Sequence, residues 1–277
     1  MDNIFIIGPT AIGKSEYALN LALSMKGDIV SADAFQVYKG MDIGTAKVIE
    51  AGQQSVKHHL IDILEPDDPY SVVEFIRRST SLLEASKING RPLIFCGGTG
   101  FYVNAFLYNY ELTGPGENTD IRNELLLEKR GKEPTYLWNK LEKIDKEASL
   151  VLNPNDEKRL IRAIEYKLET GLSITSLKKN ESIRSDFKVI GLTAERERIR
   201  ERIDIRVDQM FAAGLVGEVE ALLEKGFSPK LKAFEAIGYK EVIAYLEGSM
   251  GLEEVIILVK IKTRQFAKRQ MTWFKKD

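Results

Sequence analysis

One eight-residue segment limits what this chain can fold into more than any other feature. Residues 8–15 read GPTAIGKS and fit the pattern G-x-x-x-x-G-K-[ST]. The apolar stretch 3–7 before them predicts a strand, and the stretch 14–25 after them carries apolar residues at helical spacing. A strand, a glycine-rich loop and a helix in this order predict a phosphate-binding loop in an α/β fold.

The residue types of this loop indicate how it would hold an anion. Gly8 and Gly13 let the backbone turn its amide hydrogens inward around a phosphate. Lys14 adds a mobile cation, and Ser15 can ligate a magnesium ion that bridges phosphate oxygens. The loop predicts binding of a di- or triphosphate, with ATP as one candidate, through Gly8, Thr10, Ala11, Ile12, Gly13, Lys14 and Ser15.

Three strands with intervening helices are predicted in the first 110 residues. We place the strands at 3–7, 28–31 and 92–96, and the helices at 14–25 and 71–87. Strands that alternate with helices are typical of a parallel sheet covered by helices. The expected fold class is therefore α/β, a P-loop parallel sheet flanked by helices, with an inserted helical subdomain.

A change of pattern marks the insertion. Turn residues cluster at 112–119, and residues 120–179 are charged and helical in character without a convincing strand. We expect a P-loop catalytic core formed by 1–111 and 186–277, and a helical insertion domain at 112–185. The elements predicted after the insertion are a strand at 187–192, a helix over 195–225 interrupted at Gly214, and a helix over 252–274.

The composition excludes several classes of protein. Lys and Arg total 40 against 41 Asp and Glu, and apolar runs such as 4–7 and 256–259 are far shorter than the roughly 20 residues that span a bilayer. The start of the chain lacks the pattern of a secretory signal. A single cysteine, Cys96, with only His58 and His59, excludes a disulfide framework and a cysteine-rich zinc site. We expect a cytoplasmic enzyme and interpret these three residues as structural.

Two polar residues follow predicted strands at the edge where parallel sheets bind ligands. Asp33 follows the strand at 28–31 and suits a magnesium ligand, a general base, a ribose anchor or a turn cap. Thr99 follows the strand at 92–96 and suits a substrate contact or a helix N-cap. The second of these strands ends without the acidic magnesium ligand typical of ATPases, which counts against ATP hydrolysis.

An ordered set of segments carries a resemblance to a known family. The segments are 8–15, Asp33, 36–47 (QVYKGMDIGTAK), 59–62 (HLID), 97–100 (GGTG), 154–156 (PND) with Arg159 and Arg162, 206–210 (RVDQM), 237–241 (IGYKE) and 263–274 (TRQFAKRQMTWF). Together they resemble the bacterial tRNA dimethylallyltransferases, also called tRNA isopentenyltransferases. The resemblance covers nearly the whole chain.

The resemblance implies transfer of a dimethylallyl group from dimethylallyl diphosphate to N6 of the adenosine immediately 3′ of the anticodon in tRNA. The phosphate loop would hold the donor's diphosphate, with Mg²⁺ near Ser15. Asp33 matches the family's catalytic aspartate, Thr99 its threonine near the reacting base, and Arg206 an arginine that contacts diphosphate. The positions implied to bind tRNA are Asp33, Ala34, Phe35, Gln36, Thr99, Arg122, Lys158, Arg159, Leu160, Ile161 and Arg162.

The same resemblance implies the partners and shows where this chain departs from its family. The partners are tRNA, through its anticodon stem-loop, and dimethylallyl diphosphate, with no membrane and a monomeric chain. Ala34 stands where serine commonly follows the catalytic aspartate, Lys57 where proline often precedes the histidine pair, and Asn153 where histidine is frequent. The change at position 34 concerns one hydrogen bond to RNA, and none of the three affects the residues assigned to chemistry.

The residues suit this chemistry. The lone pair of adenine N6 is delocalised into the ring, so N6 attacks carbon poorly unless a proton is removed, a role that suits Asp33 as general base. Lys14, Arg206, magnesium and the loop amides would neutralise the leaving diphosphate. Spacing alone cannot separate Arg206 from Arg202, because five arginines alternate with five acids over residues 195–208.

The C-terminal stretch is a second candidate RNA surface. Residues 260–276 contain seven basic residues and no acid, interleaved with aromatic residues. This composition suits a face that tracks phosphates, and equally a solvated basic helix face whose aromatic residues lie in the core.

Two other functions stay open from the sequence. One is a P-loop kinase or a prenyltransferase acting on free nucleotides, and the other is a nucleotide-gated RNA-binding protein without turnover. The helical insertion and the basic C-terminal stretch favour a macromolecular substrate over the first. The missing acid after the strand at 92–96 counts against a hydrolytic switch, and therefore against the second.

Overall fold

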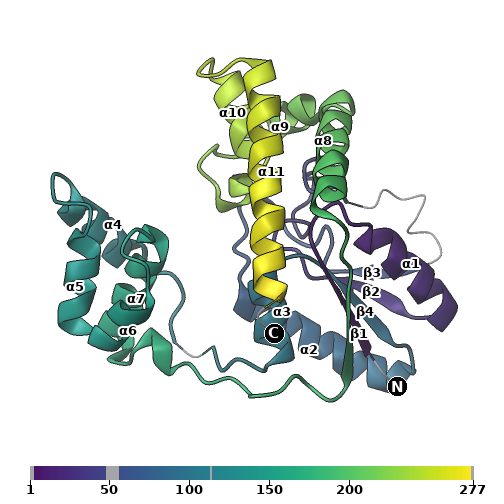
Figure 1. The fold of residues 1–277 in the computed structure, drawn as a ribbon, viewed down its shortest axis with the longest axis horizontal. Coiled ribbons are helices and arrows are strands. Elements are labelled where there is room, and N and C mark those ends of the chain that lie inside the picture. Colours follow the sequence, from purple (N-terminus) through teal and green to yellow (C-terminus); the bar gives the residue numbers. More distant parts are fainter. Residues whose placement is uncertain (1–2, 48–55, 113, 276–277) are drawn as a thin grey trace. The chain divides into compact units, whose positions relative to one another are not determined.

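A five-stranded parallel sheet lies in the first structural unit of the chain (Figure 1). The computed structural model describes residues 3–47, 56–112 and 114–275. All strand pairs in the sheet are parallel, and the strand order is β3-β2-β4-β1-β5. The strands are β1 (Asn3–Ile7), β2 (Asp28–Ser31), β3 (His58–His59), β4 (Leu93–Cys96) and β5 (Phe187–Gly191). The predicted α/β fold with a parallel sheet is confirmed.

Contacts divide the chain into two units. The first comprises Met1–Leu107 and Ile183–Asp277, and the second comprises Tyr108–Ser182. The second unit begins and ends a few residues before the insertion expected at 112–185. Its regular elements, in the part that the structure describes, are all helical.

Helix α1 (Lys14–Met25) covers one face of the sheet. Strand residues alternate between the two faces, so Ile4 and Ile6 of β1 point the same way. They pack with Ala18 and Ala22, the two fully buried alanines of the helix, in one apolar cluster. Small side chains on the helix let it approach the strands closely, and this holds the start of α1 at the end of β1.

Aromatic side chains fill the opposite face, beneath α2 (Val72–Asn89) and α3 (Gly100–Leu107). Phe5 stacks on Phe95 with ring centroids 5.2 Å apart, and Phe95 stacks on Phe106 of α3 at 5.1 Å. All three rings are 0–1% exposed. Each buried ring contributes about 1.5–3 kcal/mol from its removal from water, so this layer fixes α3 against the sheet.

In the described part of the first unit, four α-helices follow β5. The helix predicted over 195–225 is interrupted at Gly214, as expected, because that residue has φ 98° and starts a new helix. The helix predicted over 252–274 is confirmed with the same bounds. No helix in the described ranges is both long and apolar enough to cross a membrane. The four are α8 (Arg196–Ala212), α9 (Leu215–Glu224), α10 (Tyr239–Leu246) and α11 (Leu252–Phe274).

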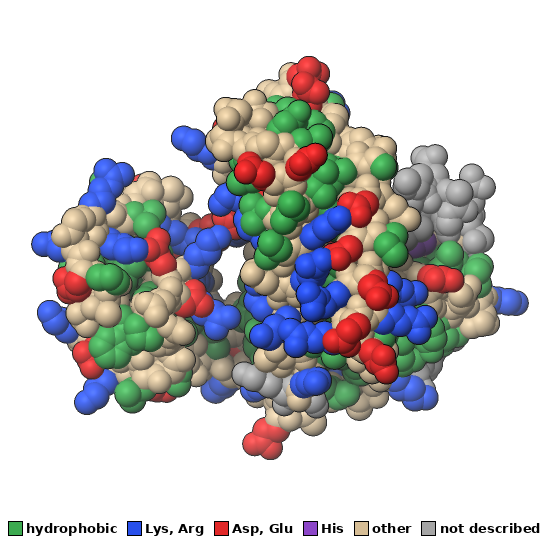
Figure 2. All heavy atoms as spheres, turned by 45° about the horizontal axis from the view of Figure 1, so that its top comes forward, with side chains coloured by type: hydrophobic (Ala, Val, Ile, Leu, Met, Phe, Trp, Pro, Cys, Tyr) green, Lys and Arg blue, Asp and Glu red, His purple; other side chains and the backbone are tan. Residues whose placement is uncertain are grey.

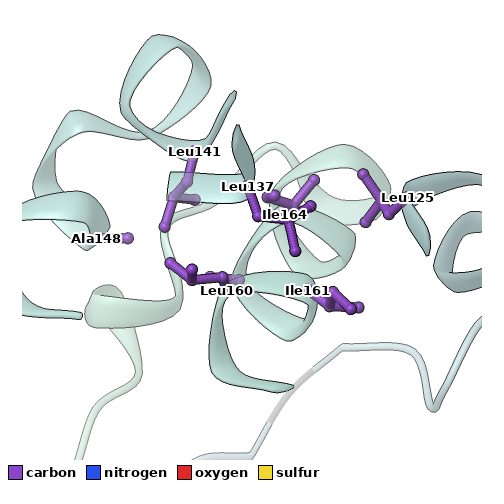
Figure 3. Packing of buried hydrophobic residues seen from close by; sticks show 8 residues of the cluster. Leu125, Leu137, Leu141, Ala148, Leu160, Ile161 and Ile164 are labelled. Carbon is purple, nitrogen blue, oxygen red and sulfur yellow. The ribbon is translucent and has the colours of Figure 1, made fainter. Parts of the chain in front are cut away.

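The second unit is a small helical bundle with its own core. Its helices are α4 (Thr119–Lys129), α5 (Tyr136–Ile144), α6 (Lys146–Val151) and α7 (Glu157–Thr170). Asn118, Asp145 and Asp156 cap the starts of α4, α6 and α7 with side-chain oxygens that accept backbone N–H groups. The apolar side chains converge between the helices in Figure 3, and the buried members of this core are Leu125, Leu137, Leu141, Ala148, Leu160, Ile161, Ala163 and Ile164.

Candidate functional site

The glycine-rich loop joins β1 to α1. Gly8 has φ 146°, and a Cβ there would lie 2.5 Å from the carbonyl oxygen of Leu192, so only glycine fits. Gly13 has φ 100° and precedes α1 without any side-chain cap. The first N–H groups of α1 therefore have no capping side chain, which leaves a helix N-terminus suited to an anion.

Lys14 folds back over the loop. Its ammonium group donates to the carbonyl oxygens of Gly8 at 2.9 Å and Pro9 at 2.8 Å. Burial lowers the pKa of Lys14 to about 8, and the positive charge of Arg206 acts in the same direction, whereas the carboxylate of Asp33 raises the pKa. An anion bound in the loop would raise the pKa again, so Lys14 is a cation held ready for a negative ligand.

Ser15 and Cys96 lie at the first turn of α1 and the end of β4. Burial raises the pKa of the Cys96 thiol to about 11, and the Ser15 hydroxyl approaches that thiol. The thiol stays protonated at neutral pH, which agrees with a structural role. Across the described ranges, no group of three or more His, Cys, Asp or Glu side chains could hold a metal ion.

Asp33 lies in the loop after β2. Its Oδ1 accepts the backbone N–H of Phe35 at 2.9 Å and of Gln36 at 3.4 Å, so the carboxylate does cap a turn. No described residue donates to Oδ2. One oxygen thus orients the carboxylate while the other is available to a ligand or a proton.

Thr99 joins the loop after β4 to the loop after β2. Its Oγ1 accepts the backbone N–H of Ala34 at 3.2 Å, which leaves the hydroxyl hydrogen to donate elsewhere. The loops approach so closely that a Cβ at Gly97 would lie 2.3 Å from the carbonyl oxygen of Ala32. The sequence alternatives of N-cap and substrate contact therefore omitted a third role, which is to tie two loops together.

The structure separates two arginines that spacing could not. Arg202 of α8 donates to the carbonyl oxygen of Ile12 at 3.1 Å and so supports the phosphate loop. Arg206, one turn further on, is half-buried and forms no ion pair with any residue of the described ranges. Burial lowers its pKa, and the Asp33 carboxylate opposes that shift. The charges of Lys14, Asp33 and Arg206 thus act on one another.

Gln36 and the segment after it are held from inside the protein. The Gln36 side chain accepts the Ser31 hydroxyl at 2.7 Å and donates to the carbonyl oxygen of Thr45 at 3.2 Å. Glu218 of α9 accepts the backbone N–H groups of residues 42–44 at 2.7–3.2 Å. Sequence reasoning missed Glu218, because a single exposed-looking glutamate on a helix carries no local signal of this contact.

The 237–241 segment supports the same loop. The Tyr239 hydroxyl donates to Glu218 at 2.6 Å. A Cβ at Gly44 would lie 2.4 Å from the Tyr239 ring, which explains the glycine. Two of the segments that carried the family resemblance, 36–47 and 237–241, therefore contact each other. This contact supports the chain that follows Asp33.

The second unit contains the remaining positions implied to bind tRNA. Leu160 and Ile161 are 1% and 7% exposed in the helical core (Figure 3), so their side chains are unavailable to RNA. Arg159 is exposed and pairs with Asp156. Lys158 lies beside it in the first turn of α7.

Arg122 and Arg162 converge on the fully buried Glu165. Arg122 donates to both carboxylate oxygens at 2.7 and 2.9 Å, and Arg162 donates to Oε2 at 2.5 Å. Burial alone would raise the pKa of Glu165, but these hydrogen bonds lower it overall. The two arginines are therefore held in fixed positions by a buried carboxylate, and each retains partial exposure.

The basic residues of α11 fall into two groups. Acids of α8 and α10 neutralise one group, in the pairs Lys260–Asp208, Lys262–Glu241 and Arg264–Asp204. Lys268, Arg269 and Lys275 are exposed and have no ion pair within the described part of the chain, whereas Lys276 lies outside it. On the face drawn in Figure 2, basic and acidic side chains accordingly lie side by side over the first unit.

The fold and this site define a class of protein. It is an α/β protein in which a glycine-rich loop with its lysine and a loop with one carboxylate follow parallel strands, and in which an arginine of α8 is electrostatically coupled to that carboxylate.

Comparison with known sequences narrows the class to a family. A family model described as IPP transferase matches residues 36–277, and one described as isopentenyl transferase matches residues 1–63. A tRNA dimethylallyltransferase of Alkaliphilus metalliredigens is 43% identical over 274 residues, which cover 98% of this chain and 88% of that protein. One of Clostridioides difficile is 39% identical over 275 residues, which cover 99% and 88%.

Solved structures agree with the sequence comparison. The tRNA isopentenylpyrophosphate transferase of Bacillus halodurans matches with a TM-score of 0.73 and 39% identity, covering 100% of this chain and 87% of that chain. A eukaryotic dimethylallyltransferase acting on tRNA matches with a TM-score of 0.81 and 28% identity, covering 98% and 69%. The chain belongs to the IPP transferase family, and the resemblance inferred from its motifs is confirmed.

Proposed function

We propose that this chain transfers a dimethylallyl group from dimethylallyl diphosphate to N6 of the adenosine immediately 3′ of the anticodon in tRNA. Family membership supports prenyl transfer to tRNA. The observation that carries the chemistry is that the Asp33 carboxylate, whose Oδ2 has no donor among the described residues, acts electrostatically on Lys14 of the phosphate loop and on Arg206. The site thereby combines a base for the attacking nitrogen with cations for the leaving group.

The reaction assigns a role to each catalytic residue. Asp33 takes a proton from N6 through its free oxygen as N6 forms a bond to the allylic carbon, a general-base contribution of about 10²–10⁴-fold. The bond from that carbon to the diphosphate oxygen breaks, and the electron pair leaves with the diphosphate. Lys14 and Arg206 stabilise the charge on that group. Thr99, whose hydroxyl hydrogen is available, orients the base next to Asp33.

The diphosphate is assigned to the loop residues Gly8, Thr10, Ala11, Ile12, Gly13, Lys14 and Ser15. Mg²⁺ fits here because it prefers phosphate oxygens, water and one or two protein oxygens to an all-protein cage. Ser15, exposed in the first turn of α1, is the protein ligand that we assign to it. When bound, the metal ion would supply further neutralisation of the leaving diphosphate.

We assign recognition of the tRNA anticodon stem-loop to two places in the chain. One is the loop of Asp33, Ala34, Phe35 and Gln36 with Thr99, where the target adenine, turned out of its stack, would reach Asp33. The other is the second unit, with Arg122, Lys158, Arg159 and Arg162, whereas Leu160 and Ile161 belong to its core. We further propose a monomer that acts in the cytoplasm, where its substrate tRNA is found in bacteria.

Nucleoside analysis tests this function. Purified protein, Mg²⁺ and dimethylallyl diphosphate are incubated with unmodified tRNA, with AMP, or with tRNA whose adenosine 3′ of the anticodon is replaced by guanosine. Mass spectrometry should find prenylated adenosine only with the first substrate. Product from AMP and none from tRNA would select the free-nucleotide alternative, which the comparisons do not favour.

A further inference from the structure

Gln270 of α11 joins two loops of the site. Its Oε1 accepts the backbone N–H of Thr10 in the phosphate loop at 2.8 Å. Its Nε2 donates to the carbonyl oxygen of Gly98, directly before Thr99, at 2.9 Å. The side chain is only 4% exposed, and each polar atom of its amide makes one of these two hydrogen bonds. One amide therefore links the loop after β1 to the loop after β4.

The surroundings of Gln270 are shaped to keep it there. A Cβ at Gly98 would lie 2.1 Å from Nε2, although the backbone of Gly98 does not have the positive φ that requires glycine. The glycine is therefore needed for the Gln270 amide. One turn along α11, Trp273 packs on Gly100 so closely that a Cβ there would lie 2.6 Å from the ring. Helix α11 therefore contacts the residues on both sides of Thr99, through Gln270 at Gly98 and through Trp273 at Gly100.

The hydrogen bond from Thr10 to Gln270 gives one amide of the phosphate loop a structural partner. The Thr10 amide donates to Gln270, so Thr10 offers a diphosphate its side chain only, whereas the amides that follow Gly13 have no capping side chain. Thr10 therefore connects the loop to α11. The ammonium group of Lys14 lies 3.8 Å from the position of a Cβ on Gly98, so the linked loops place Lys14 beside the Thr99 segment.

We propose that Gln270 is the positioning residue that sets the phosphate loop, and hence the prenyl diphosphate, at the correct distance from Thr99 and the target adenine. This rests on the proposed function of the site. Gln270 touches neither substrate and acts through Thr10 and Gly98. Because a small misplacement of reacting groups costs large factors in rate, a rigid amide between the two loops is a catalytic requirement of the fold.

The first test compares Gln270→Ala with Gln265→Ala, a glutamine of the same helix that is exposed. Gln270→Ala should raise the dissociation constant for magnesium pyrophosphate about tenfold by calorimetry, and lower kcat about tenfold to a hundredfold, with an unchanged KM for tRNA. Gln265→Ala should match the wild type. Loss of folded protein alone would lower the calorimetric stoichiometry and, in the same proportion, the apparent kcat, and would leave the dissociation constant for magnesium pyrophosphate unchanged.

A double-mutant cycle isolates the Gly98 contact. Gly98→Ala should lower kcat in the wild-type background, because the methyl group displaces the amide. In the Gln270→Ala background the same substitution should cost less than about twofold, because the obstructing side chain is gone. An equal cost in both backgrounds, or constants for Gln270→Ala within twofold of the wild type, would overturn the proposal.

Two further measures keep the test decisive. Should Gln270→Ala not fold, Gln270→Glu replaces it: this variant keeps the volume and the acceptor for Thr10 but loses the donor to Gly98, so kcat must fall. Wild-type kcat in that case would also overturn the proposal. Absence of tRNA prenylation by the wild type would contradict the proposed function, whereas the affinity for magnesium pyrophosphate needs no turnover and reports on Gln270 itself.

Discussion

At the scale of residues, the site works through the mutual influence of Lys14, Asp33 and Arg206. The burial that lowers the pKa of both cations is the same burial that strengthens their attraction for a diphosphate. The Asp33 carboxylate opposes both shifts and so favours the charged form of each cation. The carboxylate is oriented through Oδ1, which is bound by its own turn.

Asp33→Asn separates catalysis from binding. The asparagine Oδ1 still accepts the N–H of Phe35, so the turn is retained, but the amide cannot take the proton from N6. We expect kcat to fall about 10²–10⁴-fold with unchanged Tm and tRNA affinity. Single-turnover kinetics with radiolabelled donor measure this directly. Turnover within threefold of the wild type would remove Asp33 from the role of base.

The pKa of Lys14, about 8, predicts how binding depends on pH. Diphosphate favours the charged ammonium, so binding raises this pKa and takes up a proton at pH values near 8. Affinity for magnesium pyrophosphate should therefore fall as pH rises through 8. Calorimetry in buffers of different ionisation enthalpy measures the proton uptake at pH 8. Lys14→Arg, which stays charged, should show no uptake from this position, and uptake equal to that of the wild type would contradict the assignment.

At the scale of elements, local patterns predicted the helices and strands far better than they predicted the site. The continuous apolar run of β1 and the helical spacing in α1 and α11 extend over several residues, so the bounds of these elements were found from the sequence. β3 has only His58 and His59 and offers no period to detect. Arg206 and Gln270 reach the loop at residues 8–15 from far along the chain, so no spacing rule could identify them.

The buried carboxylate of Glu165 predicts the behaviour of the second unit. Glu165→Gln keeps the shape but leaves Arg122 and Arg162 without their shared countercharge. We expect a loss of about 2–3 kcal/mol in the free energy of unfolding, because removing one partner of a buried ion pair leaves the other charge without a counterion. Both arginines are partly exposed, and solvent screening reduces this cost. Urea unfolding followed by tryptophan fluorescence, to which Trp138 contributes from within the second unit, measures it.

The same variant should weaken tRNA binding, because the two arginines lose their fixed positions. Glu124→Gln, an exposed change on α4, is the control and should leave both stability and tRNA affinity within experimental error. A Glu165→Gln protein as stable as the control would show that Glu165 does not organise the two arginines.

At the scale of the whole molecule, near-neutral charge results from pairing. The first unit places three acids of α8 and α10 against Lys260, Lys262 and Arg264, so those charges are already compensated within the fold. What remains of the basic stretch is Lys268, Arg269 and Lys275. A total charge near zero therefore coexists with a local group of cations at the C-terminal end of α11. This distribution suits a protein that binds one region of an RNA.

Salt dependence distinguishes compensated from uncompensated cations. Each phosphate contact that is lost should reduce the slope of log affinity against log salt by about 0.7–0.9. Replacing Lys268, Arg269 and Lys275 together by alanine should therefore reduce the slope for tRNA by about 2 if all three contact phosphates. Lys260→Ala, whose partner is Asp208, should leave the slope unchanged. Filter binding gives both slopes when it is measured between about 50 and 300 mM salt. This range brackets the physiological ionic strength of about 0.15 M. An unchanged slope in the triple variant would mean that α11 contributes to the site only from inside the protein, through Gln270 and Trp273.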